Sequence, residues 1–138
     1  DIVLKLEKIV KNIKPDIVYT HSLSDINRDH QVTASATLAA IRPISSHKIN
    51  PEIRAFETPS STDQAPSVNQ FTFKPNLYIN ITNYWKLKEK SLKIYKGELK
   101  KFPHPRSVKS IKSLAIKRGA ESGLEFAEAF CLYRKVIT

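Results

Sequence analysis

The sequence predicts an α/β fold with parallel strands and flanking helices, and three observations lead to it. Residues 2–13 carry apolar side chains at steps of three and four, the spacing of an amphipathic helix. Residues 16–20, DIVYT, follow Pro15 as a short β-branched run, which is typical of a buried strand. A second helical pattern begins at residue 30. Helix, tight turn and buried strand form one unit of a fold with parallel strands.

The loop after the first strand runs from residue 21 to residue 28. Asp29 can cap the next helix, because a short carboxylate accepts hydrogen bonds from free backbone N–H groups. That helix covers residues 30–42, and its alanines allow close packing on a sheet before Pro43 ends it. Residues 53–57, IRAFE, predict a second strand.

A long loop separates the second strand from the third. Residues 58–70, TPSSTDQAPSVNQ, are rich in Pro, Ser and Thr and cannot bury a core face. Loops of this length in compact domains are usually functional or mobile. Residues 76–82, NLYINIT, alternate as a third strand, and Thr82 or Asn83 caps a long helix predicted to reach about Lys101.

Two prolines then interrupt the chain in FPHPRS, residues 102–107. Arg106 or Ser107 begins another helix, which ends within residues 119–123. Residues 125–136 close the chain as a strand or a short extended segment. No internal repeat or domain boundary is visible, so we expect a single domain.

Composition excludes several classes of protein. The 138 residues are 41% hydrophobic and 26% charged, which excludes bulk disorder, and no apolar run reaches the ~20 residues of a membrane span. The net charge of +10 permits nucleic acid as a partner. Its lysines are spread along helices without an arginine cluster, so we expect a solvated surface instead. The lone Cys131, in an apolar setting, is typical of a buried residue in a reducing, cytoplasmic compartment.

The chain contains no Met and begins at Asp1. We interpret it as part of a longer protein, N-terminally truncated, whose upstream segment could hold part of any active site. We expect the chain to associate with that segment or with itself, because a sheet without its neighbouring strands exposes an edge.

The stretch THSLSDINRDHQ, residues 20–31, is the first candidate site. It leaves the carboxyl end of the first strand, where open α/β sheets bind ligands. The imidazole of His30 could bind Zn²⁺ or Fe²⁺, with Asp29 beside it as a supporting carboxylate. A catalytic zinc needs three protein ligands, and the spacing does not fix His21. The alternative is an Asp29 cap with a histidine on the helix face.

The second candidate is PHPRS, residues 103–107. His104 lies between two prolines, which stiffen its backbone, and Arg106 and Ser107 begin a helix whose N-terminus favours anions. This indicates either a catalytic or substrate contact or simply the start of a helix. His47 is expected to be an exposed loop residue.

Together the two motifs resemble the PIG-L/LmbE family of metal-dependent N-acetyl-sugar deacetylases. The signature H-x-x-x-D-x-N/H-x-D-H is matched by residues 21–30, and FETPSSTD, PNLYINIT and FPHPRS extend the resemblance over essentially the whole chain. It implies a Rossmann-like fold with one metal, usually zinc, bound by His30 and supported by Asp29. The family's H-P-D-D motif, which supplies other ligands and the general base, is absent. The resemblance therefore implies that residues 1–138 are the C-terminal portion of one deacetylase domain, inactive alone.

A second departure concerns the acid. Many members carry a histidine where this chain has Asn27, which can donate a hydrogen bond but cannot transfer a proton. His104 or His21 could replace it, and His104 is preferred for its stiff setting. The implied substrate is an N-acetylglucosamine-type glycoconjugate, covered by the loop after residue 57. The expected substrate contacts are Asp25, Asn27, Arg106 and Ser107. The rival interpretation is a non-catalytic basic module that binds acidic glycan or nucleic acid.

Overall fold

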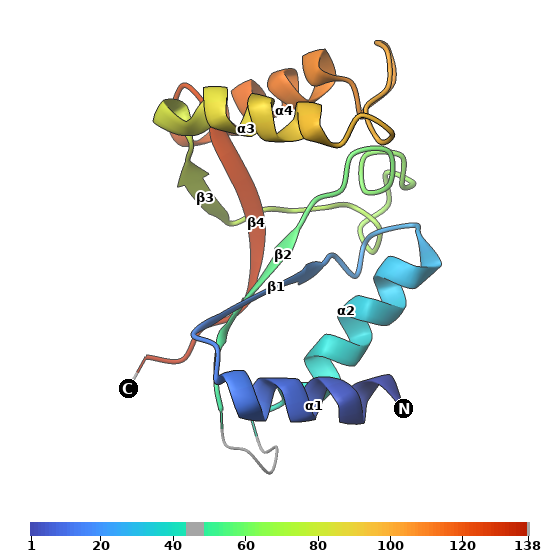
Figure 1. Cartoon of the computed structure of the whole chain (residues 1–138), viewed down its shortest axis with the longest axis vertical. Coiled ribbons are helices and arrows are strands. Elements are labelled where there is room, and N and C mark those ends of the chain that lie inside the picture. The colour runs from blue at the N-terminus through green and yellow to red at the C-terminus, as the bar shows by residue number, and fades with distance from the viewer. Residues whose placement is uncertain (44–48, 138) are drawn as a thin grey trace. The chain divides into compact units, whose positions relative to one another are not determined.

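A computed structural model describes residues 1–43 and 49–137 and confirms a mixed α/β fold (Figure 1). His47, expected in an exposed loop, lies outside the described residues. The chain forms two compact units. Unit 1 comprises residues 1–74 and 130–138, and unit 2 comprises residues 75–129.

The described strands form one open sheet in the order β1-β2-β4-β3. Strand β1 (Ile17–His21) pairs in parallel with β2 (Glu52–Phe56), as predicted. Strand β4 (Ala127–Arg134) is antiparallel to β2, so the expectation of parallel strands holds for the first pair only. In this pairing Phe130 lies opposite Phe56 and Arg134 lies opposite Ile53, so β4 starts beside the carboxyl end of β2 and runs back along it.

Unit 1 begins with helix α1 (Ile2–Ile13), which has the predicted bounds. Asp1 caps its first turn, since its carboxylate accepts a hydrogen bond from the backbone N–H of Val3. Lys14 ends the helix in the left-handed conformation, and Pro15 prevents its continuation. Helices α1 and α2 lie beside each other, and α2 lies next to β1 (Figure 1).

The core of unit 1 is small. Val10 of α1, Ile41 after α2 and Ile53 of β2 are buried together, and Val18 and Leu38 pack against them. One buried side chain from each element therefore fixes the helices against the β1–β2 pair.

Helix α2 (Arg28–Ala40) begins two residues earlier than a cap at Asp29 would allow. The cap is Asn27, whose side-chain oxygen accepts a hydrogen bond from the N–H of Asp29, so the prediction of an Asp29 cap is wrong. Asp29 instead lies in the first turn, where a carboxylate also favours the positive end of the helix dipole. The buried alanines Ala34, Ala36 and Ala40 confirm the predicted close packing.

Strand β4 carries the single cysteine. Cys131 is partly exposed, rather than buried as predicted, and its thiol donates a hydrogen bond to the carbonyl oxygen of Lys74 at 3.1 Å. Successive side chains of a strand point to opposite faces of the sheet, which explains why the continuous apolar run AFCLY did not guarantee burial of Cys131.

In unit 2, strand β3 (Leu77–Asn80) leads through a short 3₁₀ turn, Thr82–Tyr84, into helix α3 (Trp85–Ile94). This helix ends well before the predicted Lys101, and no side chain caps its start. Tyr95 leaves the helical region and its N–H bonds the carbonyl of Leu92, the tighter pattern of a helix terminus. Turns follow, containing Gly97, a poor helix former.

Helix α4 (Val108–Ser122) begins at Ser107, as predicted. The hydroxyl of Ser107 accepts a hydrogen bond from the N–H of Ser110, and Gly123 ends the helix with a positive φ of 72°. The residue after a helix often takes this conformation, and glycine takes it without strain.

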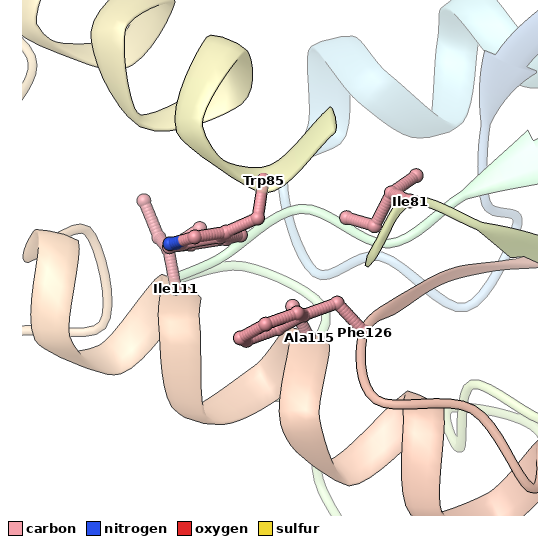
Figure 2. Close-up of a cluster of buried hydrophobic side chains, with 5 residues drawn as sticks. All are labelled: Ile81, Trp85, Ile111, Ala115 and Phe126. Atoms are coloured by element: carbon pink, nitrogen blue, oxygen red, sulfur yellow. The ribbon is translucent and has the colours of Figure 1, made fainter. Parts of the chain in front are cut away.

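The core of unit 2 joins α3, α4 and the segment before β4 (Figure 2). The rings of Trp85 and Phe126 stack with centroids 5.2 Å apart, and Ile81, Ile111 and Ala115 surround them. Trp85 is the largest of these side chains, so its position at the first residue of α3 ties that helix to the rest of the unit. No helix in the described part of the chain has the length and apolar character needed to cross a membrane.

Gly119 marks a close approach between two backbone segments of unit 2. A Cβ atom at this position would lie 2.5 Å from the carbonyl oxygen of Leu124 and 2.7 Å from that of Glu125. The N–H of Leu124 bonds the carbonyl of Gly119 at 2.8 Å, so the chain after α4 folds back onto the helix here. Gly97, by contrast, has no atom within 4 Å of that position.

We therefore expect Gly119→Ala to lower the free energy of unfolding by about 1–3 kcal/mol, although alanine is the better helix former. Gly97→Ala, the matched control, should leave that free energy unchanged or raise it slightly. Urea denaturation followed by circular dichroism measures both. Equal stability of Gly119→Ala and the parent chain would contradict the close approach.

Candidate metal centre

The turn after β1 builds the first candidate site from buried polar residues. The hydroxyls of Ser22 and Ser24 lie 2.7 Å apart, and the N–H of Ser24 donates to the hydroxyl of Ser22 at 3.2 Å. The N–H of Asp25 then donates to the carbonyl of Ser22 at 3.2 Å. These bonds fold the chain back sharply, so Asp25 turns inward instead of following the strand direction.

Asp25 is the most constrained side chain of the turn and is 0% exposed. One carboxylate oxygen accepts hydrogen bonds from the N–H of Asn27 at 2.8 Å and from the hydroxyl of Ser61. The other lies 2.9 Å from Nδ1 of His30. The side-chain amide of Gln31 also donates to the main-chain carbonyl of Asp25, at 2.6 Å. Both carboxylate oxygens are thus paired, as a buried charge requires.

Two histidines meet at this carboxylate. The rings of His21 and His30 stack almost in parallel, with centroids 3.8 Å apart and an angle of 6°. Ligand atoms from His21, Asp25 and His30 all lie within 4.8 Å of one another, which is close enough to surround one metal ion. The strand end supplies the first residue, the turn the second and the first turn of α2 the third.

The electrostatics keep the donors in the forms that metals bind. Burial disfavours the charge on Asp25, but hydrogen bonds from Ser61, Asn27 and His30 outweigh it and hold its pKa below the ordinary value. Burial, together with the neighbouring His30, lowers the pKa of His21 despite the opposing effect of Asp25. The site therefore presents an ionised carboxylate and a neutral His21 imidazole at neutral pH.

Hydrogen bonding also orients the rings. When Nδ1–H of His30 donates to Asp25, the lone pair of that imidazole lies on Nε2, which is the arrangement of a histidine metal ligand with a supporting carboxylate. Nδ1 of His21 is buried and has no hydrogen-bond partner among the described residues. A buried nitrogen without a partner is costly unless it binds something, so this atom fits a metal ligand.

The two carboxylates of residues 20–31 lie in surroundings other than those expected from the sequence. Asp25, expected to meet sugar hydroxyls at the mouth, is fully buried and supports His30 instead. Asp29, expected to be that support, is exposed on the first turn of α2. Asn27 is exposed but uses its side-chain oxygen as the helix cap. The side-chain amide nitrogen of Asn27 is not used by the cap, so it could still donate the predicted hydrogen bond to a substrate.

The second motif, residues 103–107, lies in unit 2. His104 is partly buried, and its Nδ1 accepts a hydrogen bond from the N–H of Arg106 at 3.0 Å. Arg106 forms an ion pair with Glu98. Ser107, expected to contact substrate, is 3% exposed, and its hydroxyl serves as the cap of α4 through Ser110. These contacts favour the helix-start interpretation for Ser107, while the acid role of His104 stays a prediction.

Ser61 holds Asp25 from a loop 36 positions away in the chain, and it was not among the residues predicted from the sequence. Ser61 is itself 7% exposed, and the loop around it is braced by Thr62, whose hydroxyl accepts from the N–H of Thr58 at 2.9 Å. The order of the strands does indicate that this loop lies near Asp25. The loop follows the carboxyl end of β2, which is parallel to β1, and the carboxyl ends of parallel neighbours share one edge of the sheet.

Comparison with known proteins identifies the fold. A 4-carboxy-2-hydroxymuconate hydratase, GalB from Pseudomonas putida KT2440, superposes with a TM-score of 0.74 at 20% identity. The conserved protein TT1542 from Thermus thermophilus gives 0.71 at 18% identity. An N,N'-diacetylchitobiose deacetylase from Pyrococcus horikoshii gives 0.59 at 19% identity. This chain shares their fold.

These matches cover 100%, 99% and 93% of this chain but only 60%, 60% and 49% of the three proteins, respectively. The chain thus spans about half to three-fifths of their length. No family model matches the sequence, and no curated protein matches it significantly. Identities near one fifth leave the chemistry to be argued from the site itself.

The pKa shifts predict how acid destabilises the metal-free protein. Because the pKa values of His21 and Asp25 are lowered on folding, the unfolded chain binds more protons and stability falls as pH decreases. The decline due to His21 should begin as pH drops through its ordinary value of 6.5, and that due to Asp25 as pH drops through 3.8.

Thermal unfolding with a chelator present, measured from pH 8 to pH 3, tests this expectation. In His21→Asn the first decline should be lost, whereas His104→Gln, in the other unit, should retain it. A first decline of the same size in His21→Asn would show that His21 is not the group responsible.

Proposed function

We propose that this chain carries the metal-binding part of a zinc-dependent hydrolase that removes acetyl groups from N-acetylated amino sugars. The observation that carries the proposal is the His21–Asp25–His30 group at the carboxyl end of β1. The deacetylase among the structural neighbours and the D-x-N-x-D-H pattern of the sequence support it further.

The donor set fits a divalent cation. The imidazoles of His21 and His30 are ligands that both Zn²⁺ and Fe²⁺ accept, and Asp25 would hold His30 in position instead of binding the ion itself. A bound cation would polarise an acetamide carbonyl and lower the pKa of a water molecule. His30 is the residue we assign first as a ligand, because its Nε2 is directed by the hydrogen bond to Asp25.

The chain's own residues would prepare this chemistry before any substrate arrives. Asp25 fixes the ring of His30, and Ser61 fixes Asp25. Because these side chains are already ordered, metal binding does not lower their conformational entropy further. Asn27, exposed beside the site, could donate a hydrogen bond from its amide to the substrate carbonyl. His104 remains our choice for the acid that protonates the leaving amine.

The proposal also requires groups that these residues do not provide. The one carboxylate of the cluster, Asp25, is fully buried and paired, so it is not free to act as a general base. We propose that a further segment of the protein, carrying the family's H-P-D-D motif, supplies the base and the remaining ligands.

The open edge of β1 is where we place that segment. Strand β1 pairs on one side only among the described residues, and Ile17 and Tyr19 are 40% and 50% exposed. An apolar groove of about 400 Å³ lies between α1, β1 and α2 and reaches His21. A strand added at this edge would cover the exposed apolar side chains and end beside the cluster.

A second candidate function follows from the hydratase among the neighbours. That protein superposes over the whole chain with a TM-score of 0.74, against 0.59 for the deacetylase. A hydratase acting on an unsaturated, carboxylated acid would use the same group of residues to direct water to a different electrophile.

The test is acetate release from N,N'-diacetylchitobiose or N-acetylglucosamine derivatives by the longer protein reconstituted with zinc. We expect activity there and none from the 138-residue chain alone.

His30→Ala should lose both bound zinc and activity. His104→Gln should keep its zinc and lose about 10²–10⁴ in kcat, the usual effect of removing a general acid.

Several outcomes would contradict this proposal. Stoichiometric zinc in His30→Ala would remove that residue from the ligand set, and an unchanged kcat in His104→Gln with a large loss in His21→Gln would transfer the acid role to His21. Activity on 4-carboxy-2-hydroxymuconate, without acetate release from acetylated sugars, would favour the hydratase candidate.

A further inference from the structure

Helix α3 has an outer face that the core of unit 2 does not use. Trp85 and Leu92 lie on its inner face, the first buried and the second packed against the core cluster. Leu87 and Ile94, seven residues apart and therefore on one side of the helix, point away from that core and are 62% and 74% exposed. Together they form an apolar strip on the face of α3 opposite its buried side.

An exposed tyrosine also adjoins each end of the helix. Tyr84, just before α3, is 62% exposed, and Tyr95, just after it, is 68% exposed. With Leu87 and Ile94 these residues form what we call the α3 stripe. Its length is about 15 Å, at 1.5 Å per helical residue. A leucine and an isoleucine between two tyrosines are the side chains that proteins place at an interface between water and lipid.

Positive charge lies along one side of the α3 stripe. Lys90 lies between Leu87 and Ile94 on the exposed face, and Lys86 and Lys93 flank it. Lys93 pairs with Glu89 on the same helix at 2.8 Å, so part of its charge is offset. Unit 2 as a whole holds twelve Lys and Arg against five Glu, a net charge of +7 over residues 75–129.

From this combination we infer that the α3 stripe docks unit 2 onto an anionic lipid surface. The lysines would attract the headgroups, and the aliphatic side chains would enter the boundary with the acyl chains. The helix is neither long nor apolar enough to cross a membrane, so it would lie in the plane of the surface. This inference does not depend on the proposed deacetylase activity.

Charge and chemistry together favour lipid over other occupants. A second copy of the chain would bring another strongly positive unit to the same face, and like charges oppose that contact. Nucleic acid would satisfy the lysines, but its phosphate backbone offers nothing apolar to cover Leu87 and Ile94. An anionic bilayer offers both negative charge and an apolar layer.

The experiment is co-sedimentation of the protein with vesicles of phosphatidylcholine alone or with one quarter phosphatidylserine. We expect binding to the anionic vesicles and little to the neutral ones. The double variant Leu87→Ser with Ile94→Ser should weaken binding about tenfold or more, since it removes the apolar part of the contact. Ile116→Ser is the matched control, because Ile116 is an exposed apolar residue of α4 in the same unit.

Circular dichroism should first establish that each variant is folded. Absence of binding to anionic vesicles would overturn the inference. Equal binding by the double variant and the parent would also overturn it, because the contact would then be adsorption by net charge alone. Loss of binding to duplex DNA in the double variant, without vesicle binding by the parent, would assign the stripe to nucleic acid instead.

Discussion

The buried carboxylate of Asp25 is the constraint around which the candidate site is organised. An ionised group removed from water costs several kcal/mol unless hydrogen bonds replace its hydration. Here the replacements come from three places in the chain, namely the backbone of Asn27, the hydroxyl of Ser61 and the ring of His30. Each of these partners must therefore occupy one position for the turn to be stable, and the orientation of His30 follows from that requirement.

The parallel pairing of β1 and β2 makes this arrangement possible. It brings the turn after β1 and the loop after β2 to the same edge of the sheet, where Ser61 reaches Asp25 across 36 positions of sequence. The stacked rings of His21 and His30 then place a second imidazole beside the first. The histidines thus come from the segment after β1, and the serine that fixes Asp25 comes from the loop after β2. Open α/β sheets usually bind their ligands at this edge.

Much of this could be predicted from the sequence, because local patterns decide it. The bounds of α1, the strand after Pro15 and the cap at Ser107 depend on apolar spacing, proline and a short hydroxyl side chain. The site was predicted less well. The pattern D-x-N-x-D-H contains two carboxylates, and spacing alone does not tell which one turns inward. The buried serine bonds of the turn select Asp25, and Asn27 takes the cap that was assigned to Asp29. These contacts arise from three-dimensional packing and leave no periodic signal.

Histidine ring nitrogen NMR during a zinc titration can show whether Asp25 holds His30 with its Nε2 directed at a metal. In the zinc-free protein, Nδ1 of His30 should be protonated and Nε2 should carry the lone pair. Zinc should then shift Nε2 of His30 while Nδ1 stays protonated, and Asp25→Asn should weaken zinc binding about 10–100-fold. A His30 ring that is unaffected by zinc, or a zinc-induced shift confined to His104, would contradict the account.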